Sequence, residues 1–192
     1  MTRLKVGLLG AGYIVQAHAK ALAAIDAVEL RAVCDVSRER AAQAAAEFGI
    51  PEVHTSLASL LASECDVVHV LVPPYLHESV TRQILAAGRS AFLEKPMGLD
   101  SNECDALVAL AAEKGLRLGV NHNFLFLASY EALRRDARDG TLGALDHVTV
   151  NWLYGLGLIQ FGPYNNWIVG SQGNVLFELG THLGAFVTEK IG

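Results

Sequence analysis

The stretch KVGLLGAGYIVQAHAKAL, residues 5–22, is the most informative segment of this chain. Its pattern predicts an apolar strand from Lys5 to Leu9, a glycine turn at 10–12 and a helix from Tyr13 to Leu22. A helix N-terminus carries unpaired N–H groups and about half a positive charge, so it attracts a phosphate group. A helix that directly follows a glycine turn is therefore typical of a phosphate site.

The residues of this turn have separate roles in such a site. Gly10 permits the tight turn, and Gly12 lets the backbone approach a pyrophosphate. The third glycine of the usual fingerprint is replaced by Val15, which implies a slightly wider contact between helix and strand. We predict that Gly10, Gly12, Tyr13 and Ile14 contact a dinucleotide.

Asp35 strengthens this hypothesis because it ends the apolar run Val28–Cys34. A carboxylate at the tip of the second strand accepts hydrogen bonds from an adenosine ribose. Two like charges ~4 Å apart repel by up to ~4 kcal/mol at an effective dielectric of 20, which disfavours the 2′-phosphate of NADP. Arg38 or Arg40 would reduce this cost, so we expect NAD, with NADP less favoured. An ordinary βαβ turn with a surface aspartate is the alternative.

Composition limits the class of protein. The chain has 192 residues, of which 52% are hydrophobic and 18% charged, so it forms a core. The net charge is −5 and no basic run is present, which argues against a nucleic-acid partner. No run approaches the ~20 apolar residues that span a bilayer. Three cysteines without metal-like spacing suit a reducing cytoplasm and predict no metal site.

Strands and helices alternate over the first 120 residues. Further expected strands are Val28–Cys34, Asp66–Val72, Ala91–Glu94 and Leu118–Val120, and the expected helices are Ser37–Phe48, Ser56–Ala62, Ser79–Ala87 and Ser101–Lys114. This alternation predicts an α/β domain at residues 1–122, a Rossmann fold with a doubly wound parallel sheet. Ligands of such sheets bind beyond the carboxyl ends of the strands.

The pattern changes after Asn123. The expected elements are a helix at Leu127–Arg138, an antiparallel strand at Leu145–Tyr154, a loop at Gly155–Gly173 and a helix at Val175–Lys190. This pattern predicts that residues 123–192 are the beginning of an α+β domain with an antiparallel sheet. We expect that domain to bind substrate and to form the contacts of an oligomer. Because one strand cannot form a sheet, this region needs further sequence or a partner, and we expect a homo-oligomer.

Five motifs occur in a characteristic order along the chain. They are GAG with His18 downstream, Cys34-Asp35, VPPYLH at 72–77, EKP at 94–96 and NVLFELGTH at 174–182. Together they resemble the Gfo/Idh/MocA oxidoreductase family, NAD(P)-dependent dehydrogenases and related enzymes that act mainly on sugars and polyols. The resemblance covers nearly the whole chain, and EKP is its most specific element. The family's chains run further, so this one resembles a truncated member.

The resemblance implies roles for three residues in catalysis. Lys95 of EKP matches a lysine that contacts the reacting oxygen, where an ammonium stabilises negative charge. His182 matches a histidine that takes the hydroxyl proton. Glu178, four residues earlier on the same helix face, stands where relatives usually carry aspartate, and would orient His182 or transfer protons itself. The alternatives are a surface lysine and a helical pair with a buried histidine.

The resemblance also implies further cofactor contacts. Pro73 and His77 border the nicotinamide side, Glu94 precedes the lysine, and Asn123 matches an asparagine that many relatives place before an arginine. Leu125 stands near that arginine's place, so the sequence gives no support for an anionic substrate group. A non-catalytic NAD(P)-binding sensor or scaffold is the alternative function. A different Rossmann reductase is disfavoured by EKP and the Glu178–His182 pair.

Overall fold

The chain is described by a computed structural model at residues 3–144, 146–151, 153 and 174–188, without the side chains of 174–178 and 187. It divides into two compact units, Met1–Asn121 and His122–Gly192. The division into a cofactor domain and a substrate domain is a statement about function, and it stays a prediction at this point.

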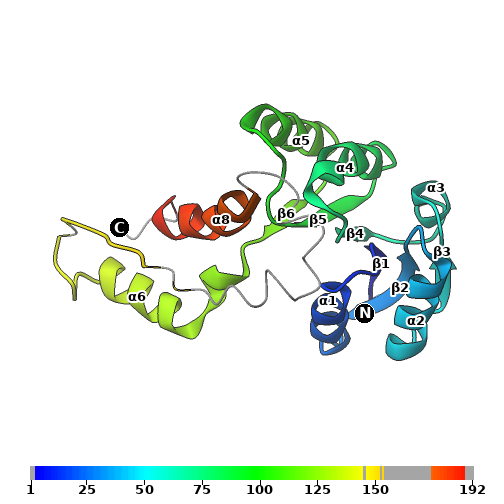
Figure 1. Cartoon of the computed structure of the whole chain (residues 1–192), viewed down its shortest axis with the longest axis horizontal. Helices are drawn as coiled ribbons and strands as arrows, with labels where there is room; N and C mark the ends of the chain where they lie inside the picture. The colour runs from blue at the N-terminus through cyan, green and yellow to red at the C-terminus, as the bar shows by residue number, and fades with distance from the viewer. Residues whose placement is uncertain (1–2, 145, 152, 154–173, 189–192) are drawn as a thin grey trace. The chain divides into compact units, whose positions relative to one another are not determined.

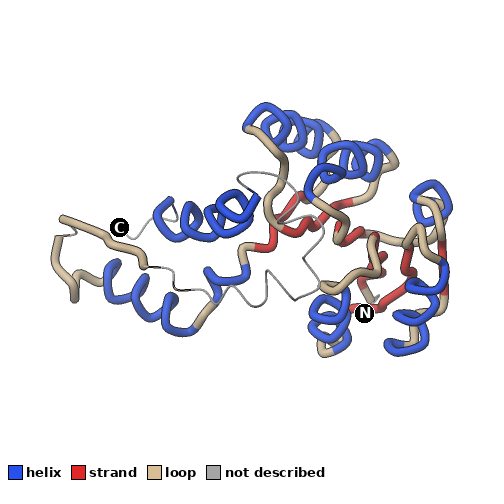
Figure 2. The backbone as a smooth tube through the Cα atoms, in the orientation of Figure 1, coloured by secondary structure: helices blue, strands red, loops and turns tan. Residues whose placement is uncertain are grey.

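A six-stranded parallel sheet forms the centre of the first unit (Figures 1 and 2). Its strands are β1 (Leu4–Leu9), β2 (Val28–Cys34), β3 (Glu52–His54), β4 (Val67–Val70), β5 (Ser90–Glu94) and β6 (Leu118–Asn121). Their order is β3-β2-β1-β4-β5-β6, so the direction of winding reverses between β1 and β4. This is the order of a Rossmann sheet, and the predicted fold class is confirmed.

Helices cover both faces of this sheet. They are α1 (Val15–Ala23), α2 (Arg38–Phe48), α3 (Leu57–Leu61), α4 (His77–Ala86) and α5 (Ser101–Glu113), with a short 3-10 turn, η1, at Pro74–Leu76. Successive residues of β1 point to opposite faces, so Leu8 joins the apolar cluster under α1 and α2, and Leu9 joins the cluster under α3, α4 and α5. Both faces are therefore buried, as a parallel sheet requires.

Local capping explains several helix boundaries. The Ser37 hydroxyl accepts from the backbone N–H of Arg40 at the start of α2, and Gly49 ends that helix with φ +66°. Ser56 and Asp100 cap α3 and α5 in the same way. These side chains satisfy N–H groups that a helix start leaves without a partner.

The second unit is described through three elements. They are the 3-10 turn η2 (Asn123–Phe126), α6 (Ala128–Arg138) and α8 (Asn174–Thr188). The Tyr130 hydroxyl donates to the carbonyl of Phe186 at 3.0 Å, and the two rings pack with centroids 4.7 Å apart, so α6 and α8 are joined. In the described part of the chain, no helix has the length and apolar character to cross a membrane.

The strand predicted at Leu145–Tyr154 is wrong for the residues that the structure describes. Residues 146–151 and 153 contain no strand, and Val148 and Val150 are exposed. Alternating side chains form a strand only where a neighbouring strand pairs with the backbone, and the described residues of this unit provide none. The predicted loop at Gly155–Gly173 lies outside the described residues.

Candidate functional site

The glycine turn sits at the carboxyl end of β1, where the sequence predicts it. Gly10 has φ +107°, and a Cβ added there would lie 2.7 Å from the carbonyl oxygen of Leu71, so only glycine fits. A Cβ on Gly12 would have no heavy atom within 4 Å. The turn is therefore closed on the side of Gly10 and open on the side of Gly12.

Helix α1 begins at Val15, two residues later than predicted, and its N-terminus has no side-chain cap. Neither an acidic residue in its first turn nor a side-chain hydrogen bond at Ile14 satisfies its N–H groups, in contrast to α2, α3 and α5. Tyr13 is exposed beside this helix start. A helix start without a side-chain cap, behind an open glycine, suits an external anion, so the turn fits the pyrophosphate of a dinucleotide. Val15 itself is buried in the core under α1.

Asp35 follows β2 as predicted, and its carboxylate is engaged inside the protein. One oxygen accepts from the backbone N–H of Ala11 at 2.8 Å, and the other accepts from the N–H of Ser37 at 2.8 Å and from Arg40 at 2.7 Å. Burial raises the pKa of Asp35, but the hydrogen bonds from Arg40, Ala11 and Ser37 outweigh it and hold that pKa below its usual range. Asp35 thus ties the glycine turn to β2, and a ribose would share its carboxylate with Arg40.

His77 begins α4, in the VPPYLH segment for which the resemblance implies a place on the nicotinamide side. Its side chain is completely buried, with Nδ1 2.6 Å from the carbonyl oxygen of Pro96 and Nε2 2.8 Å from that of Val72. Carbonyl oxygens only accept hydrogen bonds, so the His77 ring supplies the donor. His77 therefore connects the VPP segment, which begins at Val72 and includes the half-buried Pro73, to the EKP segment.

The EKP segment begins at the last residue of β5, and Lys95 is half-buried, with a cis peptide bond to Pro96. One oxygen of Glu94 accepts from Nε2 of His18 and from the amide of Asn121, each at 2.7 Å. Nδ1 of His18 lies 3.0 Å from Nδ1 of His69. We call His18, His69, Glu94 and Asn121 the buried network. It joins α1, β4, β5 and β6 directly beside Lys95.

The charge states in the buried network follow from its contacts. Burial and the neighbouring His18 together lower the pKa of His69 to about 4, so His69 is neutral near pH 7. Burial raises the pKa of Glu94, but hydrogen bonds from His18 and Asn121 outweigh burial and hold it below its usual range. Glu94 is therefore an ionised carboxylate enclosed by donors.

The remaining predicted site residues belong to the second unit. His182 is buried on α8, and its ring lies 4.4 Å from that of Phe124, measured between centroids. Glu178 precedes it by four residues on the same helix, which puts both on one helix face, and its side chain lies outside the described residues. Asn123 is exposed at the start of η2. Lys95 belongs to the first unit and His182 to the second, so their shared role in catalysis stays a prediction.

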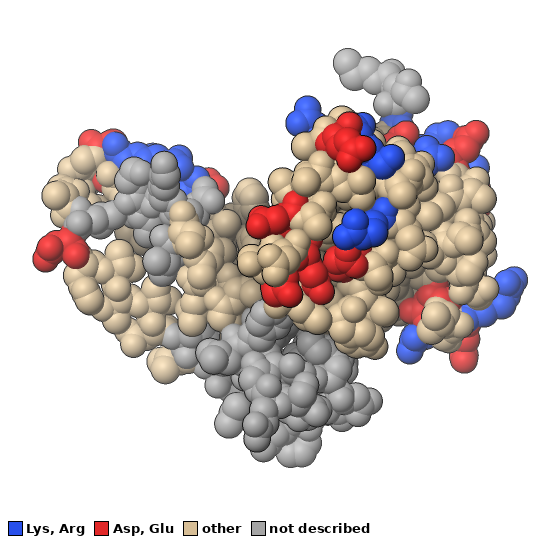
Figure 3. Space-filling view, turned by 90° about the horizontal axis from the view of Figure 1, so that it is seen from above, with Lys and Arg blue, Asp and Glu red and all other residues tan. Residues whose placement is uncertain are grey.

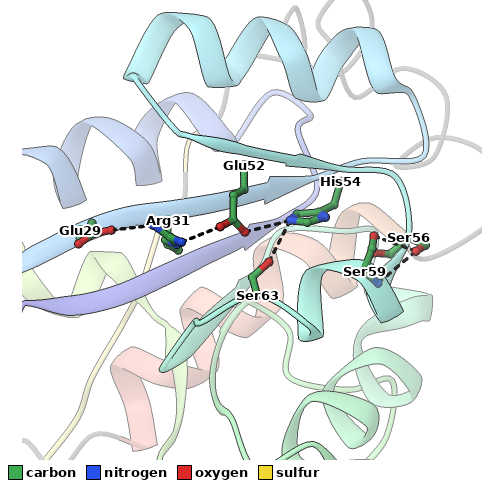
Figure 4. Close-up of polar contacts among 7 residues, drawn as sticks. All are labelled: Glu29, Arg31, Glu52, His54, Ser56, Ser59 and Ser63. Carbon is green, nitrogen blue, oxygen red and sulfur yellow. Dashed lines mark hydrogen bonds and ion pairs between the residues drawn. The ribbon is translucent and has the colours of Figure 1, made fainter.

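A second polar cluster joins β2, β3 and the turn after α3, and it has the composition of a hydrolase triad (Figure 4). The Ser63 hydroxyl is 2.9 Å from Nε2 of His54, and a Glu52 oxygen is 3.3 Å from the same nitrogen. A serine–histidine–acid relay needs the serine and the acid on opposite ring nitrogens. Ser63 is also buried. The cluster, which Arg31 extends through an ion pair with Glu52, is therefore structural.

Within residues 3–144, 146–151, 153 and 174–188, no group of three or more His, Cys, Asp or Glu side chains is arranged to hold a metal ion. The sequence reasoning missed the buried network, while Arg40 was one of the two arginines expected to offset the charge of Asp35. A histidine on the apolar face of α1 and another within the apolar strand β4 were the available signals, because a polar side chain in such a place needs a buried partner.

Comparison with known proteins links these features to one family. A family model described as an oxidoreductase family with an NAD-binding Rossmann fold, GFO_IDH_MocA, matches residues 4–122. D-apiose dehydrogenase of Paraburkholderia graminis is 29% identical over 182 residues, 94% of this chain and 48% of that protein. Inositol 2-dehydrogenase of Rhizobium meliloti is 32% identical over 147 residues, 77% of this chain and 44% of that protein.

A solved structure extends the comparison beyond the matched domain. The crystal structure of GenD2 from gentamicin A biosynthesis in complex with NAD aligns with a TM-score of 0.80 and 27% identity. The alignment covers 97% of this chain and 53% of that one. This chain therefore spans about half the length of the relatives it matches.

Proposed function

The chain belongs to the Gfo/Idh/MocA family of oxidoreductases with an NAD-binding Rossmann fold, and from this premise we propose that it serves NAD-dependent hydride transfer. The proposed substrate is a hydroxyl or carbonyl group of a sugar, a polyol or a related compound. The names of D-apiose dehydrogenase and inositol 2-dehydrogenase support that substrate class. We assign residues 1–122 to cofactor binding and 123–192 to substrate binding.

One observation carries the proposal: the uncapped N-terminus of α1 behind the open side of Gly12. Backbone N–H groups at this position would bind the pyrophosphate. Asp35 would accept from the adenosine ribose, and Pro73 and Asn123 would contact the cofactor. The face drawn in Figure 3 carries both Lys or Arg and Asp or Glu side chains.

The residues proposed for catalysis have two tasks, which are to stabilise negative charge and to transfer a proton. The bound nicotinamide supplies the hydride acceptor. The ammonium of Lys95 stabilises negative charge on the substrate oxygen. A ring nitrogen of His182 takes the hydroxyl proton, and Glu178 orients that ring. The apolar Phe124 ring beside His182 supports this role, because it limits the positions that the imidazole can adopt.

Substitution of Gly12 tests cofactor binding. Gly12→Ala adds a methyl group where the protein leaves space, so we expect the stability to change by less than about 0.5 kcal/mol. The same methyl group would block the pyrophosphate, so the Kd for NAD should rise about tenfold or more. Isothermal titration with NAD measures this effect. Gly184→Ala, in α8, is the matched control, because its Cβ also meets no heavy atom within 4 Å. Equal Kd values for both variants would contradict the proposed site.

A substrate screen separates the enzyme from a non-catalytic NAD-binding sensor or scaffold. Sugars and polyols are tested for formation of reduced nicotinamide, followed by absorbance. An enzyme gives turnover that Lys95→Ala abolishes while NAD binding persists. Binding of NAD without turnover of any substrate favours the sensor.

We further propose a homo-oligomer in the cytoplasm. The free thiols of Cys34, Cys65 and Cys104 support a reducing compartment, and burial raises the pKa of both Cys34 and Cys65 to about 11. Sedimentation velocity tests the oligomeric state, and a single monomeric species over the accessible concentrations would contradict it.

A further inference from the structure

Helix α1 contacts two parts of the proposed active site. Its N-terminus follows the glycine turn, and His18, one turn into the helix, donates to the Glu94 carboxylate at 2.7 Å. Glu94 is the residue immediately before Lys95. One rigid helix therefore reaches from the proposed pyrophosphate site to the neighbour of the proposed catalytic lysine.

We propose that His18 is a positioning residue that acts on Lys95 through Glu94, and so links the cofactor end of α1 to the lysine. This inference rests on the proposed function. It also gives Glu94 a different role from the cofactor contact predicted from sequence, because the Glu94 carboxylate accepts hydrogen bonds from His18 and Asn121 within the protein.

The hydrogen-bond chain has a defined direction. Because Glu94 is ionised, it only accepts, so Nε2 of His18 carries the hydrogen of that contact. Nδ1 of His18 faces Nδ1 of His69 at 3.0 Å, and one of these two nitrogens donates to the other. The amide of Asn121 donates to the same Glu94 oxygen. Both His18 contacts thus fix its ring plane, which in turn fixes the carboxylate.

The ionisable groups around Glu94 come from every element packed against it. They are His18 from α1, His69 from β4 and Lys95 from its own segment, while Asn121 from β6 is neutral. Without the His18 donor, the Glu94 carboxylate is held by Asn121 alone, so its negative charge is no longer fixed beside Lys95. The reactivity of the Lys95 amine therefore reports on the contact between His18 and Glu94.

The experiment measures acylation of Lys95 in the folded 192-residue chain as a function of pH, by peptide mass spectrometry. Only the free amine reacts. Glu94→Gln should move the midpoint to lower pH and raise the rate at a fixed pH about threefold, or roughly half a pH unit. His18→Phe should move it in the same direction by less. The double variant should match Glu94→Gln alone, because His18 acts through that carboxylate.

Two further variants separate positioning from stability. His18→Gln keeps an N–H donor of similar reach and should restore a profile close to that of the unsubstituted chain. His54→Phe removes a histidine from the structural cluster at β3 and should leave the Lys95 profile unchanged, although it also lowers stability. Urea unfolding of each variant confirms that it is folded. If His18→Phe fails to fold, the comparison of His18→Gln with Glu94→Gln still tests whether His18 acts through Glu94.

An unchanged Lys95 profile in folded His18→Phe would overturn the proposal, as would additive shifts in the double variant. Equal profiles for His18→Gln and Glu94→Gln would also overturn it. The labelling needs neither NAD nor substrate. Failure to bind NAD therefore counts against the proposed function alone, and an unchanged Lys95 profile counts against the role of His18 alone.

Discussion

The two units of the chain differ in how they bury apolar side chains. The first unit has an apolar cluster on each face of its sheet, whereas Tyr130 and His182 are the buried residues among those described in the second. Burial of apolar surface is the main stabilising contribution to folding. Among the described residues, the apolar core therefore lies in the first unit, while apolar residues of the second, such as Leu133, are exposed to solvent.

The largest expected effect comes from matched leucine truncations in the two units. Leu93 is completely buried in β5, so Leu93→Ala should cost about 3 kcal/mol through lost burial and the cavity left behind. Leu133 on α6 is 43% exposed, so Leu133→Ala should cost less than about 1 kcal/mol. Urea denaturation followed by far-UV circular dichroism measures both. Similar losses for the two variants would contradict the contrast between the units.

The second prediction concerns pH, and its effect comes from His69 in the first unit. Burial, reinforced by His18, lowers the pKa of folded His69 to about 4, against about 6.5 for an unfolded histidine. The unfolded chain therefore binds more protons than the folded one between these values. Stability is fully present above pH ~6.5 and is lost as pH falls toward ~4, by at most about 3 kcal/mol.

Urea unfolding between pH 4 and 7 checks this dependence. His69→Phe should flatten the curve in that window, since the group responsible is gone. His147→Phe, which changes an exposed histidine of the second unit, should leave the curve as it was. The lowered pKa values of Asp35 and Glu94 add a separate loss below pH ~4.5, because those carboxylates are stabilised in their ionised forms. If stability depends on pH with the same slope in His69→Phe, then His69 is not the group responsible.

Sequence patterns anticipate those parts of the fold that depend on near neighbours. Ser37 and Gly49 mark the ends of α2 because capping involves residues within one turn. Strand β3 escaped prediction because three residues are too few to show a period. The predicted strand at 145–154 failed because alternation alone does not provide a pairing partner.

In the candidate site, too, only features that depend on near neighbours could be predicted from the sequence. Gly10 and Asp35 could be found because their places follow from the strand–turn–helix unit and the tip of the next strand. The contact between His18 and Glu94 could not, since it joins residues 76 positions apart. His77 was recognised from its motif, but only the fold reveals that its ring lies between two backbone carbonyls.

The smallest expected effect concerns cofactor choice, and it belongs to the first unit alone. Arg40 binds the Asp35 carboxylate at 2.7 Å, which offsets the charge that would repel the 2′-phosphate of NADP. Arg40→Gln should therefore increase the preference for NAD over NADP. The Arg40 side chain is 55% exposed, so solvent screening limits the effect to about 1 kcal/mol, or roughly fivefold in the ratio of the two Kd values.

Titration of the chain with NAD and with NADP measures this ratio directly. Arg38→Gln is the matched control, because Arg38 is exposed on the same helix and makes none of the contacts to Asp35. A ratio that moves equally in both variants would mean that general positive charge on α2, rather than the Arg40–Asp35 pair, sets the selectivity. A shift toward NADP in Arg40→Gln would contradict the argument outright, since removing the arginine leaves the carboxylate uncompensated.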